Sequence, residues 1–179
     1  MGSDSVPVGG GAMEDRMKIL IYGALGIALV ALATMSIQIP VPQTRGYINL
    51  GDTVIFVFAM LFGARIGALA GGVGSALADL LTGYAHWAPF TLIIKGIEGL
   101  LVGLLASGEK SYPVRVLVGL LAGLVMVFGY FLTEVVLYGL GAALAELPGN
   151  FIQAGSAVAI GPLVVLALQR IARAIIRRI

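Results

Sequence analysis

The chain has 179 residues, of which 59% are hydrophobic and 11% are charged, and its mean hydropathy is +1.04. Because a soluble domain is about half apolar and about a quarter charged, this composition excludes a water-soluble domain. The absence of cysteine and the presence of one histidine exclude disulfides, thiolate catalysis and multi-histidine metal sites, and the net charge of +2 comes from cations near the ends of apolar segments rather than from a nucleic-acid patch.

The N-terminal stretch MGSDSVPVGGGA is small, polar and rich in glycine, and a second methionine, Met13, follows it. We interpret residues 1–12 as a leader left from expression, with a natural flexible tail as the alternative, and expect the folded domain to cover residues 13–179. The first apolar stretch, Ile19–Ile39, is about 20 residues long and ends at Pro40. It lacks a small-residue cleavage site, so we expect a retained membrane span.

Apolar segments further along the chain predict five more spans: Thr53–Gly63, Ile66–Tyr84, Phe90–Ala106, Val116–Leu140 and Gly149–Ile171. The expected fold is therefore an all-α integral membrane protein with a single bundle of six transmembrane helices. The second span is short for a bilayer at a rise of about 1.5 Å per residue, so it must be tilted, extended or shielded by its neighbours.

The cations outside the spans predict the orientation. If both termini are cytoplasmic, the outside loops carry only Arg45, and the inside segments carry all the others: Arg16, Lys18, Arg65, Lys110, Arg115, Arg170, Arg173, Arg177 and Arg178. We therefore expect both termini in the cytoplasm. The basic C-terminal end is then an anchor at the inner leaflet or, alternatively, a lipid or partner site.

Ionisable residues inside spans are costly, and each is by default a candidate for function. The residues inside spans are Asp79, Lys95, Glu98 and Glu134, and Asp52 lies at the outer edge of the second span. With this orientation, all five lie in the outer half of the bundle or near the midplane. At about 1.5 Å per residue, Lys95 and Glu98 lie roughly 8 to 12 Å below the outer end of their span. The pattern predicts an apolar inner half and a pocket open to the outside.

Three of these ionisable residues lie on two helical faces. Lys95 and Glu98 are three residues apart on one face, where mutual neutralisation without a functional role is the alternative. Glu134 shares a stripe with Tyr130 and Tyr138, although an aromatic belt at the lipid interface also explains Tyr138.

Aromatic and amide side chains gather in the outer loops and at the start of the sixth span: Tyr47, Asn49, Tyr84, His86, Trp87, Asn150 and Gln153. Such groups suit a small, flat, polar heterocycle. Alternatively, Tyr84 and Trp87 are interface anchors and His86 is a solvated loop residue.

Small residues recur at fourfold spacing, which lets helix backbones approach closely. Gly63 at the end of the second span is followed by Gly67, Gly71 and Ser75 in the third, and the fourth carries Gly99 and Gly103. We expect packing within the protein, with a partner interface as the alternative. Ala24 and Ala28 form a similar face on the first span, which is either internal or external.

The chain has no G-x-x-x-x-G-K-[ST] loop and no segment long enough for a nucleotide-binding domain, so any ATP-driven work falls to a partner. No paired nucleophile and base and no metal-ligand spacing is present, so we expect no catalytic residue, metal or bound cofactor. An intramembrane enzyme is one alternative function. A stand-alone channel or ion-coupled carrier that uses Asp79 or Glu134 as a proton site is another.

Two segments, GYINLGD at residues 46–52 and ARIGALAGGVGSALADLLTGYAHWAPFTLIIKGIEGLLVGLL at residues 64–105, resemble the substrate-binding S components of energy-coupling factor (ECF) transporters, in particular the riboflavin-type S component family. The resemblance implies a prokaryotic cell-membrane protein that captures a vitamin or vitamin precursor from outside and has no ATPase of its own. It also implies a transmembrane coupling subunit and two ATPases as partners, with Ala24 and Ala28 matching the family's docking surface. GYINLGD differs from the loop of strict riboflavin members, which favours pyridoxine-like or hydroxymethylpyrimidine-like compounds over riboflavin.

Overall fold

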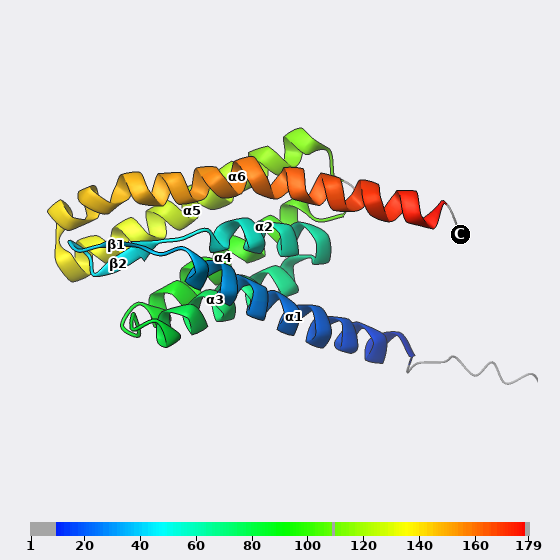
Figure 1. Cartoon of the computed structure of the whole chain (residues 1–179), viewed down its shortest axis with the longest axis horizontal. Helices are drawn as coiled ribbons and strands as arrows, with labels where there is room; N and C mark the ends of the chain where they lie inside the picture. Colours follow the sequence, from blue (N-terminus) through cyan, green and yellow to red (C-terminus); the bar gives the residue numbers. More distant parts are fainter. Residues whose placement is uncertain (1–9, 109, 178–179) are drawn as a thin grey trace, which may run out of the picture.

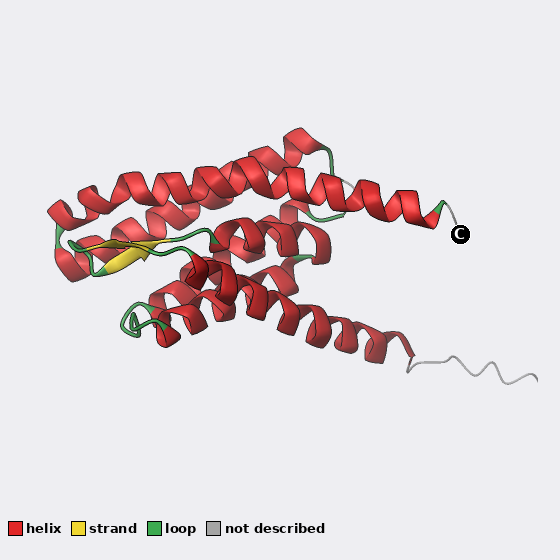
Figure 2. Cartoon of the chain, viewed as in Figure 1, coloured by secondary structure: helices red, strands yellow, loops and turns green. Residues whose placement is uncertain are grey.

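The computed structural model describes residues 10–108 and 110–177, which form six helices and one short hairpin (Figures 1 and 2). The elements are α1 (Gly10–Ser36), β1 (Ile39–Val41), β2 (Gly46–Ile48), α2 (Gly51–Phe62), α3 (Ala64–Leu81), α4 (Ala88–Ala106), α5 (Tyr112–Tyr138) and α6 (Leu140–Ile176). All helices except α2 are long and apolar enough to cross a membrane. The prediction of six helices is confirmed for this part of the chain.

The two ends of the bundle differ in what they carry. The start of α1 and the end of α6 lie at the same end, and the hairpin lies at the opposite end beside the start of α6 (Figure 1). This second end is called the hairpin end below. The shared location of the two helix ends agrees with the expectation that both termini face one side of the membrane.

The short helix α2 lies inside the bundle rather than at its edge. It contacts α1, α3, α4 and α6, and most of its residues are buried, including Ile55 and Phe56. Of the three ways to accommodate a short span, shielding by neighbouring helices is the one that the structure adopts. Its end at Gly63 has φ +87°, a conformation that glycine adopts without strain, and α3 starts at the next residue.

Glycines set the close approach of α3 and α4. A Cβ atom at Gly67 would lie 2.5 Å from the carbonyl oxygen of Gly99, and one at Gly71 would lie 2.5 Å from the carbonyl oxygen of Lys95. The expectation of packing within the protein is therefore confirmed for these positions. Gly63 lies between α2 and α3, and its backbone takes part in the same close approach, because a Cβ at Gly103 of α4 would lie 2.6 Å from the carbonyl carbon of Gly63.

The hairpin was not predicted from the sequence. β1 and β2 pair antiparallel, with Pro40 opposite Tyr47 and Val41 opposite Gly46. Strands of three residues are too short to give a periodic signal, and the prolines in this segment indicated only the end of a helix. Tyr47 of β2 then contacts Asp79 of α3, and Asn49 after the hairpin contacts Gln153 of α6.

Several helix boundaries differ from the expected spans. The sixth helix begins at Leu140 instead of Gly149, and Pro148 lies inside it. The first helix ends at Ser36 instead of Ile39 and begins at Gly10, while residues 1–9 of the expected leader lie outside the described residues. Ala24 and Ala28 lie on the exposed side of α1.

The expectation of an apolar inner half requires one correction. Arg115, which the orientation analysis placed in an inside segment, is buried in the first turn of α5. It donates from Nη1 to Oε1 of Gln169 at 3.1 Å and from Nη2 to the carbonyl oxygen of Gly108 at 2.8 Å. This arginine therefore ties the connection between α4 and α5 to α6.

Candidate functional site

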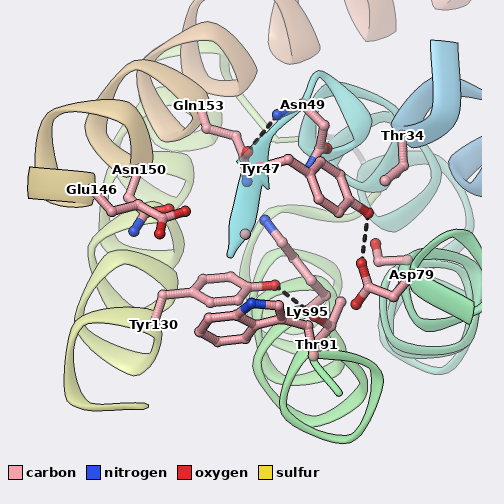
Figure 3. Close-up of a pocket in the computed structure, with 13 residues that line it drawn as sticks. Thr34, Tyr47, Asn49, Asp79, Thr91, Lys95, Tyr130, Glu146, Asn150 and Gln153 are labelled. Atoms are coloured by element: carbon pink, nitrogen blue, oxygen red, sulfur yellow. Dashed lines mark hydrogen bonds between the residues drawn. The ribbon is translucent and has the colours of Figure 1, made fainter. Parts of the chain in front are cut away.

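A cavity lies at the hairpin end, between the hairpin and α1, α3, α4, α5 and α6 (Figure 3). Its volume, measured as the space open to the centre of a water molecule, is about 30 Å³. Seven of the residues expected at the site line it: Tyr47, Asn49, Trp87, Lys95, Tyr130, Asn150 and Gln153. These residues come from one strand, two loops and three helices, so only the folded bundle brings them together.

Lys95 occupies the floor of the cavity, where it is only 1% exposed. Its ammonium group forms an ion pair with Asp52 at the start of α2, and Nζ lies 3.6 Å from Oε2 of Glu98. Gln153 donates from Nε2 to the other oxygen of Asp52 at 2.9 Å. The expected Lys95–Glu98 pair is therefore part of a larger cluster in which Asp52 is the closer partner.

This cluster contains one cation and two acids, all nearly inaccessible to solvent. Neither carboxylate oxygen of Glu98 has a hydrogen-bond partner among the described residues. A buried ammonium requires a partner because the desolvation of an isolated charge costs several kcal/mol or more. Asp52 meets that requirement for Lys95, and the second acid gives the cluster an excess of acceptors.

Tyr47 extends from β2 toward α3 (Figure 3). Its hydroxyl donates to Oδ1 of Asp79 at 2.6 Å, and its ring lies 4.4 Å from that of Tyr84, measured between centroids. Burial and the neighbouring Asp79 carboxyl raise the pKa of Tyr47, so its phenol stays protonated and remains a donor. This contact fastens the hairpin to α3.

Several aromatic side chains lie together at another side of the cavity. The ring of Trp87 lies 5.9 Å from that of Tyr130 and 6.0 Å from that of Tyr138, measured between centroids. The indole donates to the carbonyl oxygen of Thr44 at 3.3 Å, and the ammonium of Lys95 lies 5.3 Å from the centroid of the Tyr130 ring. Trp87 is 4% exposed, so its environment is the interior of the protein and not the lipid interface.

Two amide side chains of α6, Asn150 and Gln153, also line the cavity. Asn150 donates from Nδ2 to Oε1 of Glu134 at 3.1 Å, which joins α6 to α5. The side-chain oxygen of Gln153 accepts from the backbone N–H of Asn49 at 2.9 Å, which joins α6 to the loop after the hairpin. Both amides are buried, so their orientation is fixed by these contacts.

The other five expected site residues do not line the cavity. Tyr84, Glu98, Glu134 and Tyr138 contact residues that do, through the ring contacts and polar contacts given above. His86 is exposed in the loop before α4, with its ring 6.0 Å from that of Trp87. This placement agrees with the alternative that His86 is a solvated loop residue.

Six residues of the cavity wall were not among the expected site residues: Thr34, Gly46, Ser75, Asp79, Thr91 and Glu146. Asp79 had a detectable signal, because a carboxyl group inside an apolar span is costly. Glu146 was missed because the sixth span was expected to begin after it. Thr34, Ser75 and Thr91 carry small hydroxyls that are common in membrane helices, so no sequence signal separates them from packing residues.

The side chains around the cavity are of the kinds that contact a flat ring and offer it hydrogen bonds. Among the described residues, no group of three His, Cys, Asp or Glu side chains has the geometry of a metal site. The chemistry on this wall is that of binding: rings, amides, hydroxyls and carboxyl groups converge on one enclosed space.

Comparison with known proteins gives a family and several relatives. Residues 15–170 match the family described as "ECF-type riboflavin transporter, S component". An uncharacterized protein from Pyrococcus woesei is 50% identical over 133 residues, which cover 74% of this chain and 88% of that protein. The thiamine precursor transporter HmpT of Lactococcus lactis is 36% identical over 141 residues, which cover 78% of this chain and 81% of that protein. A UPF0397 protein of Streptococcus pneumoniae is 37% identical over 95 residues, about half of each chain.

Proposed function

Because the chain belongs to the family of ECF-type riboflavin transporter S components, we propose that it captures a vitamin or vitamin precursor from outside the cell for ATP-driven uptake. The protein is a multi-pass protein of the cell membrane. The observation that carries the proposal is the enclosed cavity at the hairpin end, which combines aromatic rings with buried amides and charges in an otherwise apolar bundle.

The substrate in this proposal is a heterocycle with a single ring. The cavity of about 30 Å³ leaves little room, so even a small ring requires the hairpin and side chains to move apart, and a flavin with three fused rings requires far more. The relative named as a thiamine precursor transporter also supports a small precursor. Pyridoxine-like and hydroxymethylpyrimidine-like compounds are therefore the first candidates.

The proposed orientation has six spans and both termini in the cytoplasm. The shared location of the start of α1 and the end of α6 supports it (Figure 1). The hairpin end then faces outward, and the substrate enters the cavity from outside. The hairpin, fastened to α3 by the contact between Tyr47 and Asp79, covers the entrance.

The proposed partners are a transmembrane coupling subunit and two ATPases that consume ATP. Ala24 and Ala28 form the proposed docking face, and their exposure on α1 is the feature that supports it. Small side chains at four-residue spacing let a partner helix approach the α1 backbone closely.

Uptake of a labelled precursor in cells tests this proposal. We expect uptake when the chain is produced together with an ECF coupling module and no uptake when either part is missing. Uptake that persists without the ATPases would instead support the stand-alone carrier considered in the sequence analysis.

The docking face has its own test. Ala28→Trp should abolish uptake and leave ligand binding by the purified chain unchanged, because the substitution lies on the exposed side of α1. Ala159→Trp, at an exposed alanine of α6, is the matched control and should leave uptake near the wild-type level. Equal uptake by both variants would contradict the assignment of this face.

A further inference from the structure

Around the cavity, the ammonium and amide donors have hydrogen-bond partners within the protein, whereas the hydroxyl of Thr34 has none among the described residues. The ammonium of Lys95 pairs with Asp52, and Nε2 of Gln153 donates to the same carboxyl group at 2.9 Å. Nδ2 of Asn150 donates to Glu134 at 3.1 Å. These side chains therefore have protein acceptors before any ligand arrives.

Two carboxylate oxygens at the cavity are in the opposite situation. Oδ2 of Asp79 and Oε2 of Glu146 are buried and have no hydrogen-bond partner among the described residues. The side chains are 2% and 5% exposed, respectively. The Thr91 hydroxyl lies near Asp79 and that of Thr44 near Glu146, but neither hydroxyl reaches these two oxygens. A buried acceptor without a partner is unfavourable, so both positions favour a ligand that donates.

The two carboxyl groups lie on opposite sides of the cavity. Asp79 comes from α3 and Glu146 from α6, and Figure 3 shows them at the right and left of the enclosed space, with Tyr47 above and Tyr130 below. A flat ring that enters between the two carboxyl groups, once the hairpin and side chains move apart to admit it, would have one edge toward each of them. The geometry therefore matches a ring with donors at two edges.

Charge leads to the same conclusion. In the described part of the chain, the bundle around the cavity buries one ammonium group, that of Lys95, and five carboxyl groups: Asp52, Asp79, Glu98, Glu134 and Glu146. Fields act strongly in an interior of low dielectric constant. The oxygens of these acids favour a ligand with N–H donors, and any of the acids that is ionised disfavours a carboxylate or phosphate on the ligand.

We propose that the ligand is a flat nitrogen heterocycle that donates N–H hydrogen bonds to Asp79 and Glu146 and carries no anionic group. This inference rests on the proposed function and narrows its substrate class. An amino-substituted pyrimidine fits, because an exocyclic amino group supplies two N–H donors and protonation of a ring nitrogen supplies another. Rings with a carboxylate or phosphate substituent do not fit.

Titration calorimetry on the wild-type protein in detergent tests the inference without any substitution. The probes are the hydroxymethyl aminopyrimidine precursor of thiamine, the same ring with hydrogen in place of the amino group, pyridoxine, and nicotinate as an anionic ring. We expect the aminopyrimidine to bind at least about tenfold more tightly than its deaminated analogue, and nicotinate not to bind.

Two isosteric variants test whether Asp79 and Glu146 accept the N–H hydrogen bonds of the ligand. Asp79→Asn and Glu146→Gln each replace a carboxylate with an amide of nearly the same shape, and each should weaken aminopyrimidine binding by about tenfold or more. The loss should be smaller for the deaminated ring, which lacks the N–H groups. Glu14→Gln is the matched control, because Glu14 is exposed and pairs only with Lys18 on the surface of α1, and it should leave the affinity unchanged.

The outcomes separate this inference from the function on which it rests. If the deaminated ring or nicotinate binds as tightly as the aminopyrimidine, the inference is wrong while the proposed function stands. If none of the four rings binds, the inference is wrong, and so is the proposal that the substrate is a vitamin or precursor with a single ring. Should a variant unfold, which thermal unfolding detects, the comparison of ligands on the wild-type protein still decides.

Discussion

The bundle has two halves that are built on different principles. At the opposite end from the hairpin, helices α2, α4, α5 and α6 bury an apolar cluster that includes Phe56, Met60, Val102 and Val165. At the hairpin end, the same helices together with α1 and α3 bury carboxyl groups, amides and the ammonium of Lys95 around a cavity. The side chains of the apolar cluster need no hydrogen-bond partner, whereas the hairpin end buries carboxyl oxygens that have none among the described residues.

This difference separates stability from function. Apolar packing lowers the free energy of the folded chain without selecting any ligand, while unpaired polar groups lower stability and are retained where they bind something. The account therefore predicts that substitutions in the apolar half change the stability of the protein, and that substitutions at the hairpin end change ligand affinity. The following predictions test that separation.

Lys95→Met should have the largest effect, because it removes the cation from a cluster with two buried acids. We expect loss of detectable ligand binding and a decrease in stability of about 3–5 kcal/mol, measured by calorimetry and by thermal unfolding in detergent. Adding Asp52→Asn should restore part of the stability but not the binding. A Lys95→Met protein that binds as tightly as wild type would show that the cluster is purely structural.

Phe56→Ala should decrease the stability by about 3–5 kcal/mol, because the ring is fully buried between α2, α5 and α6 and its loss leaves a cavity. Ligand affinity measured at a temperature where the variant stays folded should remain within about twofold of wild type, since Phe56 does not line the cavity at the hairpin end. A large loss of affinity in the folded variant would contradict the claim that the apolar half affects stability but not ligand binding.

Gly67→Ala should decrease the stability by about 1–3 kcal/mol, because the new methyl group overlaps the backbone of α4 at Gly99. Gly155→Ala is the matched control on α6, where a Cβ would meet nothing within 4 Å. We expect that control to leave the unfolding temperature unchanged or slightly higher, since alanine favours a helix. Equal destabilisation by both variants would contradict the close packing of α3 on α4.

Tyr47→Phe should have the smallest effect. It removes the hydrogen bond to Asp79 at 2.6 Å, which fastens the hairpin over the cavity. A loss of about 1 kcal/mol corresponds to a ligand affinity about fivefold weaker, with most of the change in the dissociation rate. Surface plasmon resonance measures that rate, and an unchanged value would exclude the hairpin from ligand retention.

The sequence predicted the parts of the structure that depend on local composition. The six helices follow from apolar segments, and Lys95 and Glu134 were identified because ionisable groups inside such segments are costly. The hairpin could not be predicted, because strands of three residues give no periodic signal. The role of Glu146 could not be predicted, because it depends on contacts between distant segments. Asp52 was recognised only as a residue at a span edge, because its pairing with Lys95 requires α2 to lie inside the bundle.

Native mass spectrometry of the purified protein tests the central claim most directly, because it detects both a ligand carried through purification and one added from a panel of vitamins and precursors. The account predicts one heterocycle bound per chain in the wild-type protein and in Phe56→Ala, and none in Lys95→Met. A wild-type protein that binds no member of the panel, or a ligand retained equally by Lys95→Met, would contradict the claim that the cavity at the hairpin end is the binding site.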